Sequence, residues 1–283
     1  MQTPDNFGGL PERYSNYEKS GIVILPVPFD KTSTWQHGAE LGPEKIIEAA
    51  QNMELFDIET GSEIYHEGIH TDAPIVAETS AEMVAAVQTR VGQHLQAGKF
   101  VVTLGGEHTV SLGAIQAHLK KFGNISILQL DAHTDLRDIY EGSKLSHACV
   151  MARVRELTDE VVAVGIRSMD ESEGERLEEE RTTFAHEMQT SGWIKRVVRE
   201  LSDQVYITLD LDVFDPSIMP STGTPEPGGM DWYQMMRLLE AVTEVKKIVG
   251  FDVVELCPNE HNRAPDFLAA KLIYRILSMR FGR

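Results

Sequence analysis

Residues 125–135 read ISILQLDAHTD, a short apolar run that ends in three side chains of metal-ligand type. The run has the length of a strand and is rich in isoleucine and leucine, which predicts a buried β-strand over 125–130. Asp131, His133 and Asp135 follow it at two-residue spacing. If the chain stays extended, these three side chains lie on one face at the end of a core strand.

Five further apolar runs of strand length recur along the chain. They are IVIL at 22–25, FVVTL at 100–104, VVAVGI at 161–166, VYITL at 205–209 and IVGFDVV at 248–254. Stretches with helical periodicity alternate with the runs, at 80–97, 109–121, 192–202, 231–243 and 266–279. This alternation predicts an α/β fold with a parallel sheet covered on both faces, in a single domain over residues 1–283.

Two of these runs end in the same way as the first. Asp210 and Asp212 follow the run at 205–209, and Gly105-Gly106-Glu107-His108 ends the run at 100–104. Ligands of open α/β sheets bind beyond the carboxyl ends of the strands. Each motif alone could be an ordinary turn or cap. Together, four carboxylates and two imidazoles at three strand ends would be costly unless a cation neutralised them.

The number of candidate ligands indicates two metal ions. Six side chains exceed the three that a protein usually supplies to one catalytic zinc, and carboxylate-rich sites suit harder ions such as manganese. Paired ions of this kind are typical of hydrolases. The residues therefore predict a hydrolytic enzyme with a binuclear metal site.

Composition narrows the range of partners. The chain has 283 residues and a formal net charge of −18 at pH 7, which predicts no binding to nucleic acid or to a membrane and favours a cationic ligand. The sequence shows no membrane span and no secretory signal, so we expect a cytoplasmic protein. Cys149 and Cys257 show no CxxC spacing and should be buried free thiols. The acidic segment 170–180 is typical of a solvated loop and helix start.

A second metal-binding pattern is weaker. HEGIH at 66–70 matches the H-E-x-x-H pattern of zinc proteases, which binds zinc only when it lies on a helix. Gly68 interrupts the pattern and turn-forming residues follow at 71–74, which indicates strand and turn. We therefore do not expect His66 and His70 to hold a metal.

Seven segments resemble, in order, those of the ureohydrolase family, which contains arginase and agmatinase. They are PFDKTSTWQHGAELGP at 28–43, GGEH at 105–108, DAHTD at 131–135, YEGSKLSHACVM at 140–151, GIRS at 165–168, DLDVFDPSIMPSTGTPEPGG at 210–229 and DVVELCP at 252–258. The resemblance implies a three-layer α/β/α fold with a mostly parallel central sheet (arginase-like) and assembly into a homotrimer or homohexamer. It also implies cleavage of a guanidino group to urea and an amine.

The resemblance implies a ligand set for two Mn²⁺ ions per chain, with Co²⁺, Ni²⁺ or Fe²⁺ as alternatives. One ion would be held by His108, Asp131, Asp135 and Asp210, and the other by Asp131, His133, Asp210 and Asp212. Asp131 and Asp210 would then bridge the two ions.

The same resemblance assigns Glu255 to the guanidinium group and His147 to proton transfer. Glu255 ends a buried run, where a carboxylate can accept paired N–H bonds from a planar guanidinium or simply cap the chain. His147 lies among turn-forming residues, where an imidazole can exchange protons or be an ordinary surface histidine. Asp135, beside the bridging position, is expected to carry a proton to the leaving nitrogen.

Two further positions bear on the substrate. Family arginases have an asparagine two residues after the DAHTD motif, which contacts the amino acid end of arginine, whereas this chain has Arg137. Asp170 matches the family's acidic contact for a substrate ammonium. Agmatine keeps an ammonium and lacks a carboxylate, so we expect hydrolysis of agmatine to putrescine, a step of polyamine biosynthesis. Because Arg137 could hold a substrate carboxylate, a guanidinobutyrase or an arginase is the alternative.

Two other functions fit parts of the pattern. A zinc deacetylase-like hydrolase could use an Asp-His-Asp site on such a sheet, although His108 and Asp135 would then be surplus ligands. An inactive regulatory homologue could keep the fold, although all six ligand positions are filled here. Metal stoichiometry and urea release distinguish these functions.

Overall fold

The computed structural model describes residues 4–282, and its strands form one central sheet. The strands lie in the order β2 (Ile69–Thr71), β1 (Ile22–Val27), β3 (Phe100–Gly105), β8 (Lys247–Val254), β7 (Gln204–Asp210), β4 (Ser126–Leu130), β5 (Val161–Ile166), β6 (Thr182–Phe184). Every neighbouring pair is parallel. The predicted α/β fold is therefore confirmed.

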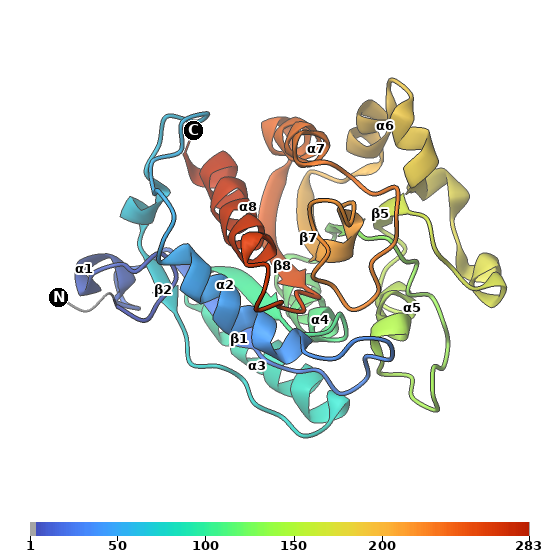
Figure 1. Ribbon diagram of the computed structural model, residues 1–283, viewed down its shortest axis with the longest axis horizontal. Coiled ribbons are helices and arrows are strands. Elements are labelled where there is room, and N and C mark those ends of the chain that lie inside the picture. Colours follow the sequence, from blue (N-terminus) through green and yellow to red (C-terminus); the bar gives the residue numbers. More distant parts are fainter. Residues whose placement is uncertain (1–3, 283) are drawn as a thin grey trace.

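Helices cover both faces of the sheet (Figure 1). One face packs against α2 (Gly42–Ala50), α6 (Trp193–Glu200), α7 (Trp232–Val245) and α8 (Ala264–Phe281). The other packs against α3 (Ser80–Gln96), α4 (Val110–Phe122) and α5 (Val150–Arg155). The short elements are α1 (Glu12–Ser15) and the 3₁₀ helices η1 (Ala39–Leu41), η2 (Ile64–Glu67), η3 (His147–Cys149), η4 (Glu171–Arg176), η5 (Glu179–Arg181), η6 (Ala185–Gln189) and η7 (Leu211–Val213).

The six apolar runs all form strands, with ends within two residues of the predicted ones. Two strands lie outside the six apolar runs: β2 falls in the HEGIH segment, where strand and turn were expected, and β6 was not predicted. Each has three residues at an edge of the sheet, and their sequences, IHT and TTF, contain no apolar run. Such short edge strands are defined by their neighbours rather than by their own composition.

Parallel pairing brings the predicted ligands to one edge of the sheet. Leu130 pairs with Leu209, so Asp131 and Asp210 are the next residues of adjacent strands. Leu209 in turn pairs with Val253, which places the end of β8 beside them. The carboxyl ends of four central strands, β3, β8, β7 and β4, therefore meet where the side chains of a site can converge.

The turn after β3 depends on a glycine. A Cβ atom on Gly106 would lie 2.1 Å from the carbonyl oxygen of Phe29, which no other residue type could tolerate. The Gly106 N–H donates to Val27, and the Glu107 N–H donates to Phe29. The loop after β1 and the turn that carries His108 are thus held together through their backbones.

The weaker motif and the cysteines behave as expected. His66 lies in the 3₁₀ helix η2 and stacks on Tyr65, while His70 lies in β2 and is hydrogen-bonded to a backbone carbonyl, so no single α-helix carries both histidines. Cys149 and Cys257 are buried free thiols. Among residues 4–282, no helix has both the length and the apolarity needed to cross a membrane.

His118 gives the fold a measurable pH dependence. It is fully buried in α4, donates to the carbonyl of Ala114 and packs against Tyr206, and burial lowers its pKa from 6.5 to about 4. Because the folded pKa is the lower one, this contribution to stability is complete above pH about 6.5 and is lost as the pH falls towards 4.

We expect wild type to lose about 2 kcal/mol of unfolding free energy relative to His118→Gln between pH 7.5 and 5. Glutamine keeps a donor but does not titrate, so the difference between the two proteins isolates the imidazole. Urea unfolding at both pH values measures it. Parallel pH dependences of the two proteins would contradict the assignment.

Candidate metal centre and substrate pocket

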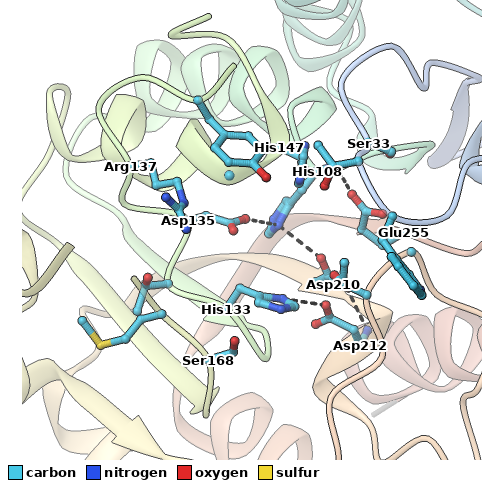
Figure 2. A pocket seen from close by; sticks show the side chains of 18 of the residues that line it. Ser33, His108, His133, Asp135, Arg137, His147, Ser168, Asp210, Asp212 and Glu255 are labelled. Atoms are coloured by element: carbon cyan, nitrogen blue, oxygen red, sulfur yellow. Dashed lines mark hydrogen bonds and ion pairs between the residues drawn. The ribbon is translucent and has the colours of Figure 1, made fainter. Parts of the chain in front are cut away.

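A cavity of about 240 Å³ opens at the carboxyl edge of the sheet. Its lining includes His108, His133, Asp135, Arg137, His147, Asp170, Asp210, Asp212 and Glu255. Figure 2 shows the histidine and aspartate side chains converging at its centre. Asp131 is fully buried beneath them and contacts the same imidazoles. The structure thus brings together the side chains that the sequence singled out.

The first group of ligand atoms surrounds the Nδ1 atom of His108. This nitrogen lies 2.9 Å from Asp135 Oδ2, 3.2 Å from Asp131 Oδ2 and 3.4 Å from Asp210 Oδ2. His108, Asp131 and Asp135 are close enough to hold one ion, and all three are buried. Four potential donors thus converge on one point.

The second group lies around His133. Its Nδ1 atom is 2.9 Å from Asp212 Oδ2 and 3.8 Å from Asp131 Oδ1. Asp131, His133 and Asp212 could hold a second ion. Asp131 belongs to both groups and offers a different oxygen to each, an arrangement that suits a ligand shared by two ions.

The electrostatics of the cluster fit a cation. Burial and the neighbouring carboxylates raise the pKa of Asp135 to about 7 and that of Asp210 well above its usual range. Burial alone would lower the pKa values of His108 and His133, but hydrogen bonds and charges from the aspartates raise both, that of His133 to about 11. Protons therefore supply the positive charge that these groups need, and divalent ions could replace them.

Hydrogen bonds fix the orientation of the carboxylates. The His133 N–H donates to Asp131 Oδ1 at 2.7 Å, and the side chain of Gln129 donates to Oδ2 at 2.9 Å. The Asp212 N–H donates to Asp210 Oδ1 at 2.8 Å. These bonds leave other lone pairs for a metal, so the site is largely preorganised.

The other ring nitrogen of His108, Nε2, is also hydrogen-bonded. Its Nε2 atom lies 2.9 Å from the hydroxyl of Thr208, which donates to the buried carboxylate of Asp252 at 2.8 Å. Ser111 and Tyr206 donate to the same carboxylate. This network favours the tautomer that leaves Nδ1 free for a metal.

Two site residues have left-handed backbone conformations. Asp135 has φ 51° and Glu255 has φ 67°, in a region that non-glycine residues rarely occupy. The Glu255 N–H donates to the carbonyl of Gly106 at 2.8 Å, and its carboxylate accepts the His108 N–H at 2.7 Å. Backbone strain of this kind concentrates where side chains must be aimed at a ligand.

Glu255 directly follows β8, and its buried carboxylate faces the cavity. Burial and the charge of Glu107 raise its pKa well above the usual range. In Figure 2, Glu255 and Arg137 lie on opposite sides of the histidine and aspartate cluster. The cavity therefore has two distinct ends, one at each of these residues.

At the second end, Arg137 faces Asp170. Their side chains approach to 3.3 Å, and the guanidinium lies 5.0 Å from the centre of the Tyr140 ring. The hydroxyl of Ser172 and the charge of Arg137 lower the pKa of Asp170. The predicted ammonium contact therefore already has a cationic partner, and the side chain of Arg137 points into the pocket.

The sequence predicted that segment 170–180 is solvated, but the structure shows that one of its residues is buried. Most of it is exposed, but Glu173 is only 4% exposed and lines the cavity. Its carboxylate accepts the N–H groups of Leu136 and Asp170. The segment DESEGERLEEE contains six glutamates, and the sequence gave no sign of which one turns inward.

His147 lies at the start of η3, lines the cavity and contacts Tyr140 edge-to-face at 5.7 Å. Burial and the nearby charges of His133 and His108 lower its pKa to about 4, so the imidazole is neutral at physiological pH. Its Nδ1 atom contacts Thr32, which in turn binds Glu107. Sequence reasoning missed both of these residues, although each lies inside a segment that carried the family resemblance.

Comparisons with known proteins agree with this geometry. A sequence model of the arginase family matches residues 20–278. An N(1)-aminopropylagmatine ureohydrolase of Thermus thermophilus is 39% identical over 274 residues, covering 95% of this chain and 93% of the relative. An agmatinase of Pyrococcus horikoshii is 31% identical and covers 91% of each chain. The agmatine ureohydrolase structure of Thermoplasma volcanium aligns with TM-score 0.89 and 30% identity, over 100% of this chain and 96% of that one.

The shared position of Asp131 predicts the behaviour of a variant. Asp131→Asn should bind clearly less than two divalent ions per chain, because the substitution weakens both ligand groups. Asp210→Ala should do the same if Asp210 bridges. The matched control is Asp215→Asn. Asp215 lies five residues after Asp210, and its carboxylate accepts the Ser217 N–H instead of joining the ligand cluster. Elemental analysis after dialysis against manganese tests this, and full metal content in Asp131→Asn would refute it.

Proposed function

Because this chain is a ureohydrolase of the arginase family, we propose that it hydrolyses agmatine to putrescine and urea. The observation that carries the choice of substrate lies at the Arg137 end of the pocket. Two carboxylates, Asp170 and Glu173, line the cavity there together with the guanidinium of Arg137, which contacts Asp170. The resulting negative balance favours a substrate tail that is cationic, as that of agmatine is, over one that carries a carboxylate.

The metal cluster would provide the nucleophile. The arginase family depends on a binuclear metal centre, and this chain has a His/Asp cluster that can hold metal. We assign the two positions to Mn²⁺, with the ligands His108, Asp131, His133, Asp135, Asp210 and Asp212. Two divalent cations at such a site lower the pKa of water enough to supply a nucleophile near neutral pH.

Glu255 would bind and orient the guanidinium. Its buried carboxylate can accept paired N–H bonds, and a substrate cation would relieve the repulsion that raises its pKa. A planar group held there lies beside the aspartate cluster, where its central carbon can be attacked.

Asp135 and His147 would move the protons. Hydrolysis adds water to the guanidinium carbon, breaks one C–N bond and requires a proton on the departing amine. Asp135 Oδ2 lies 2.9 Å from His108 Nδ1, within the ligand cluster, and we assign to it the transfer of a proton from water to the leaving nitrogen. His147, at the wall of the same cavity, would exchange protons with solvent.

A longer substrate, N(1)-aminopropylagmatine, is a second candidate. The relative from Thermus thermophilus carries that name at 39% identity. In addition, a second cavity of about 440 Å³ shares Ser168 and Met169 with the first, so there is space beyond the Arg137 end. An aminopropyl extension would add a further positive charge, which the same carboxylates favour.

The other functions considered from the sequence have less support. Membership of the arginase family argues against a zinc deacetylase-like hydrolase, and the two convergent ligand groups argue against an inactive homologue. Guanidinobutyrase and arginase activities remain as comparisons for the substrate screen, because Arg137 faces the pocket.

A urea-release screen with added Mn²⁺ tests the proposal. We expect kcat/KM to be at least about tenfold higher for agmatine or N(1)-aminopropylagmatine than for arginine or guanidinobutyrate, because a carboxylate near Asp170 and Glu173 is repelled. No urea from any of the four compounds, with both metals bound, would refute the ureohydrolase activity. A preference for guanidinobutyrate or arginine would refute only the assignment of a cationic tail.

Variants at the tail end sharpen the test. Asp170→Asn should lower kcat/KM for agmatine roughly tenfold, while Arg137→Ala should raise it and abolish any turnover of guanidinobutyrate. Glu175→Gln is the matched control, since it removes an exposed carboxylate two residues from Glu173 and outside the cavity lining. If Asp170→Asn and Glu175→Gln behave alike, Asp170 does not contact the substrate.

A further inference from the structure

A hydroxyl connects His147 to a buried carboxylate. Thr32 Oγ1 lies 3.2 Å from His147 Nδ1 and is also in hydrogen-bond contact with Glu107 Oε2. The backbone N–H of His147 donates to the same hydroxyl oxygen at 3.0 Å, and the backbone N–H of Thr32 donates to Glu107 Oε2 at 3.0 Å. Glu107 is fully buried, whereas Thr32 and His147 are partly buried.

With Glu107 as a carboxylate, these contacts fix the direction of the hydrogen bonds. An ionised carboxylate has only acceptors, and Glu107 Oε2 also accepts the Thr32 N–H. The hydroxyl of Thr32 therefore donates its one proton to Oε2. A hydroxyl oxygen has two lone pairs, and the His147 N–H uses one of them. The second lone pair faces Nδ1, which must carry a proton to make this contact.

We propose that Glu107 and Thr32 are positioning residues that hold His147 as the Nδ1–H tautomer, so that Nε2 is the nitrogen that exchanges protons in the pocket. The inference rests on the proposed role of His147 in proton transfer. The hydroxyl of Ser146 is a weaker candidate for the same task, since it lies 3.5 Å from Nδ1. Tyr140 limits rotation of the ring from its edge.

The hydrogen bond between Thr32 and His147 selects one of the two tautomers that a neutral imidazole can adopt. A neutral imidazole can carry its proton on either nitrogen, and only one of the two tautomers leaves Nε2 able to accept a proton from the pocket. Without the Thr32 hydroxyl both tautomers would be populated and the ring could turn. The loss should appear in the rate of turnover, because Thr32 itself does not bind the guanidinium.

Kinetics of Thr32 variants provide the first test. On the best substrate of the screen, Thr32→Val should lower kcat roughly 10- to 100-fold while KM changes less than about threefold, and Thr32→Ser should restore most of the rate. The matched control is Thr103→Val, since Thr103 is buried in β3 and its hydroxyl has no partner within residues 4–282. Its kcat should stay within about twofold of wild type.

A double variant separates positioning of His147 from simple anchoring of the loop. If Thr32 acts through His147, the kcat of Thr32→Val/His147→Ala should equal that of His147→Ala alone. Losses that multiply would overturn the proposal, as would wild-type kcat in Thr32→Val. Metal content, measured on each variant, should be the same as in wild type.

The tautomer itself can be observed without turnover. In ¹⁵N-histidine-labelled, metal-free protein at pH 8, the long-range ¹⁵N–¹H pattern that disappears in His147→Ala should be that of the Nδ1–H form. Thr32→Ser should keep this pattern, and Thr32→Val should change it. An Nε2–H pattern in wild type would refute the inference while leaving urea release intact. Failure of urea release with the expected pattern would refute the proposed function instead.

Discussion

The structure depends on holding several buried carboxylates of like charge at one edge of a parallel sheet. Asp131 directly follows β4, Asp210 ends the adjacent β7, and Asp212 lies two residues further on, so the register holds the three charges close together. Imidazoles and backbone N–H groups offset part of the cost, and protons or cations must supply the rest. The glycine turn, the left-handed residues and the hydroxyl networks all serve to keep this arrangement rigid.

The sequence predicted the features that depend on the order of neighbouring residues. Apolar runs marked the six long strands, and the two-residue spacing after them marked the residues that converge. Contacts between distant segments could not be predicted. Nothing in the sequence links Thr32 with Glu107, 75 residues later, or shows that Arg137 reaches Asp170. Glu173 was missed because one of its partners, the N–H of Leu136, lies on a segment 37 residues away.

Both ends of the pocket carry carboxylates, but these differ in how strongly they interact with a bound cation. Glu255 is 8% exposed, and a buried carboxylate interacts strongly with a bound cation. The side chain of Asp170 is 41% exposed and pairs with Arg137. Solvent and this ion pair therefore both weaken its attraction for a bound cation. Under the proposed function, the guanidinium is therefore recognised by a residue of the core. Preference for the rest of the substrate can shift through rim residues without disturbing the metal ligands.

The place of β8 in the sheet has a consequence for the order of assembly. This strand, the last in the chain, lies between β3 and β7, so without it the sheet is two separate blocks, β2-β1-β3 and β7-β4-β5-β6. His108 follows a strand of the first block, while Asp131 and Asp210 belong to the second. During synthesis both blocks present open edges to the same missing strand, which favours slow folding and mispairing. A paired metal centre can therefore form only on a chain whose residues 247–254 have already inserted, and metal uptake reports completed folding.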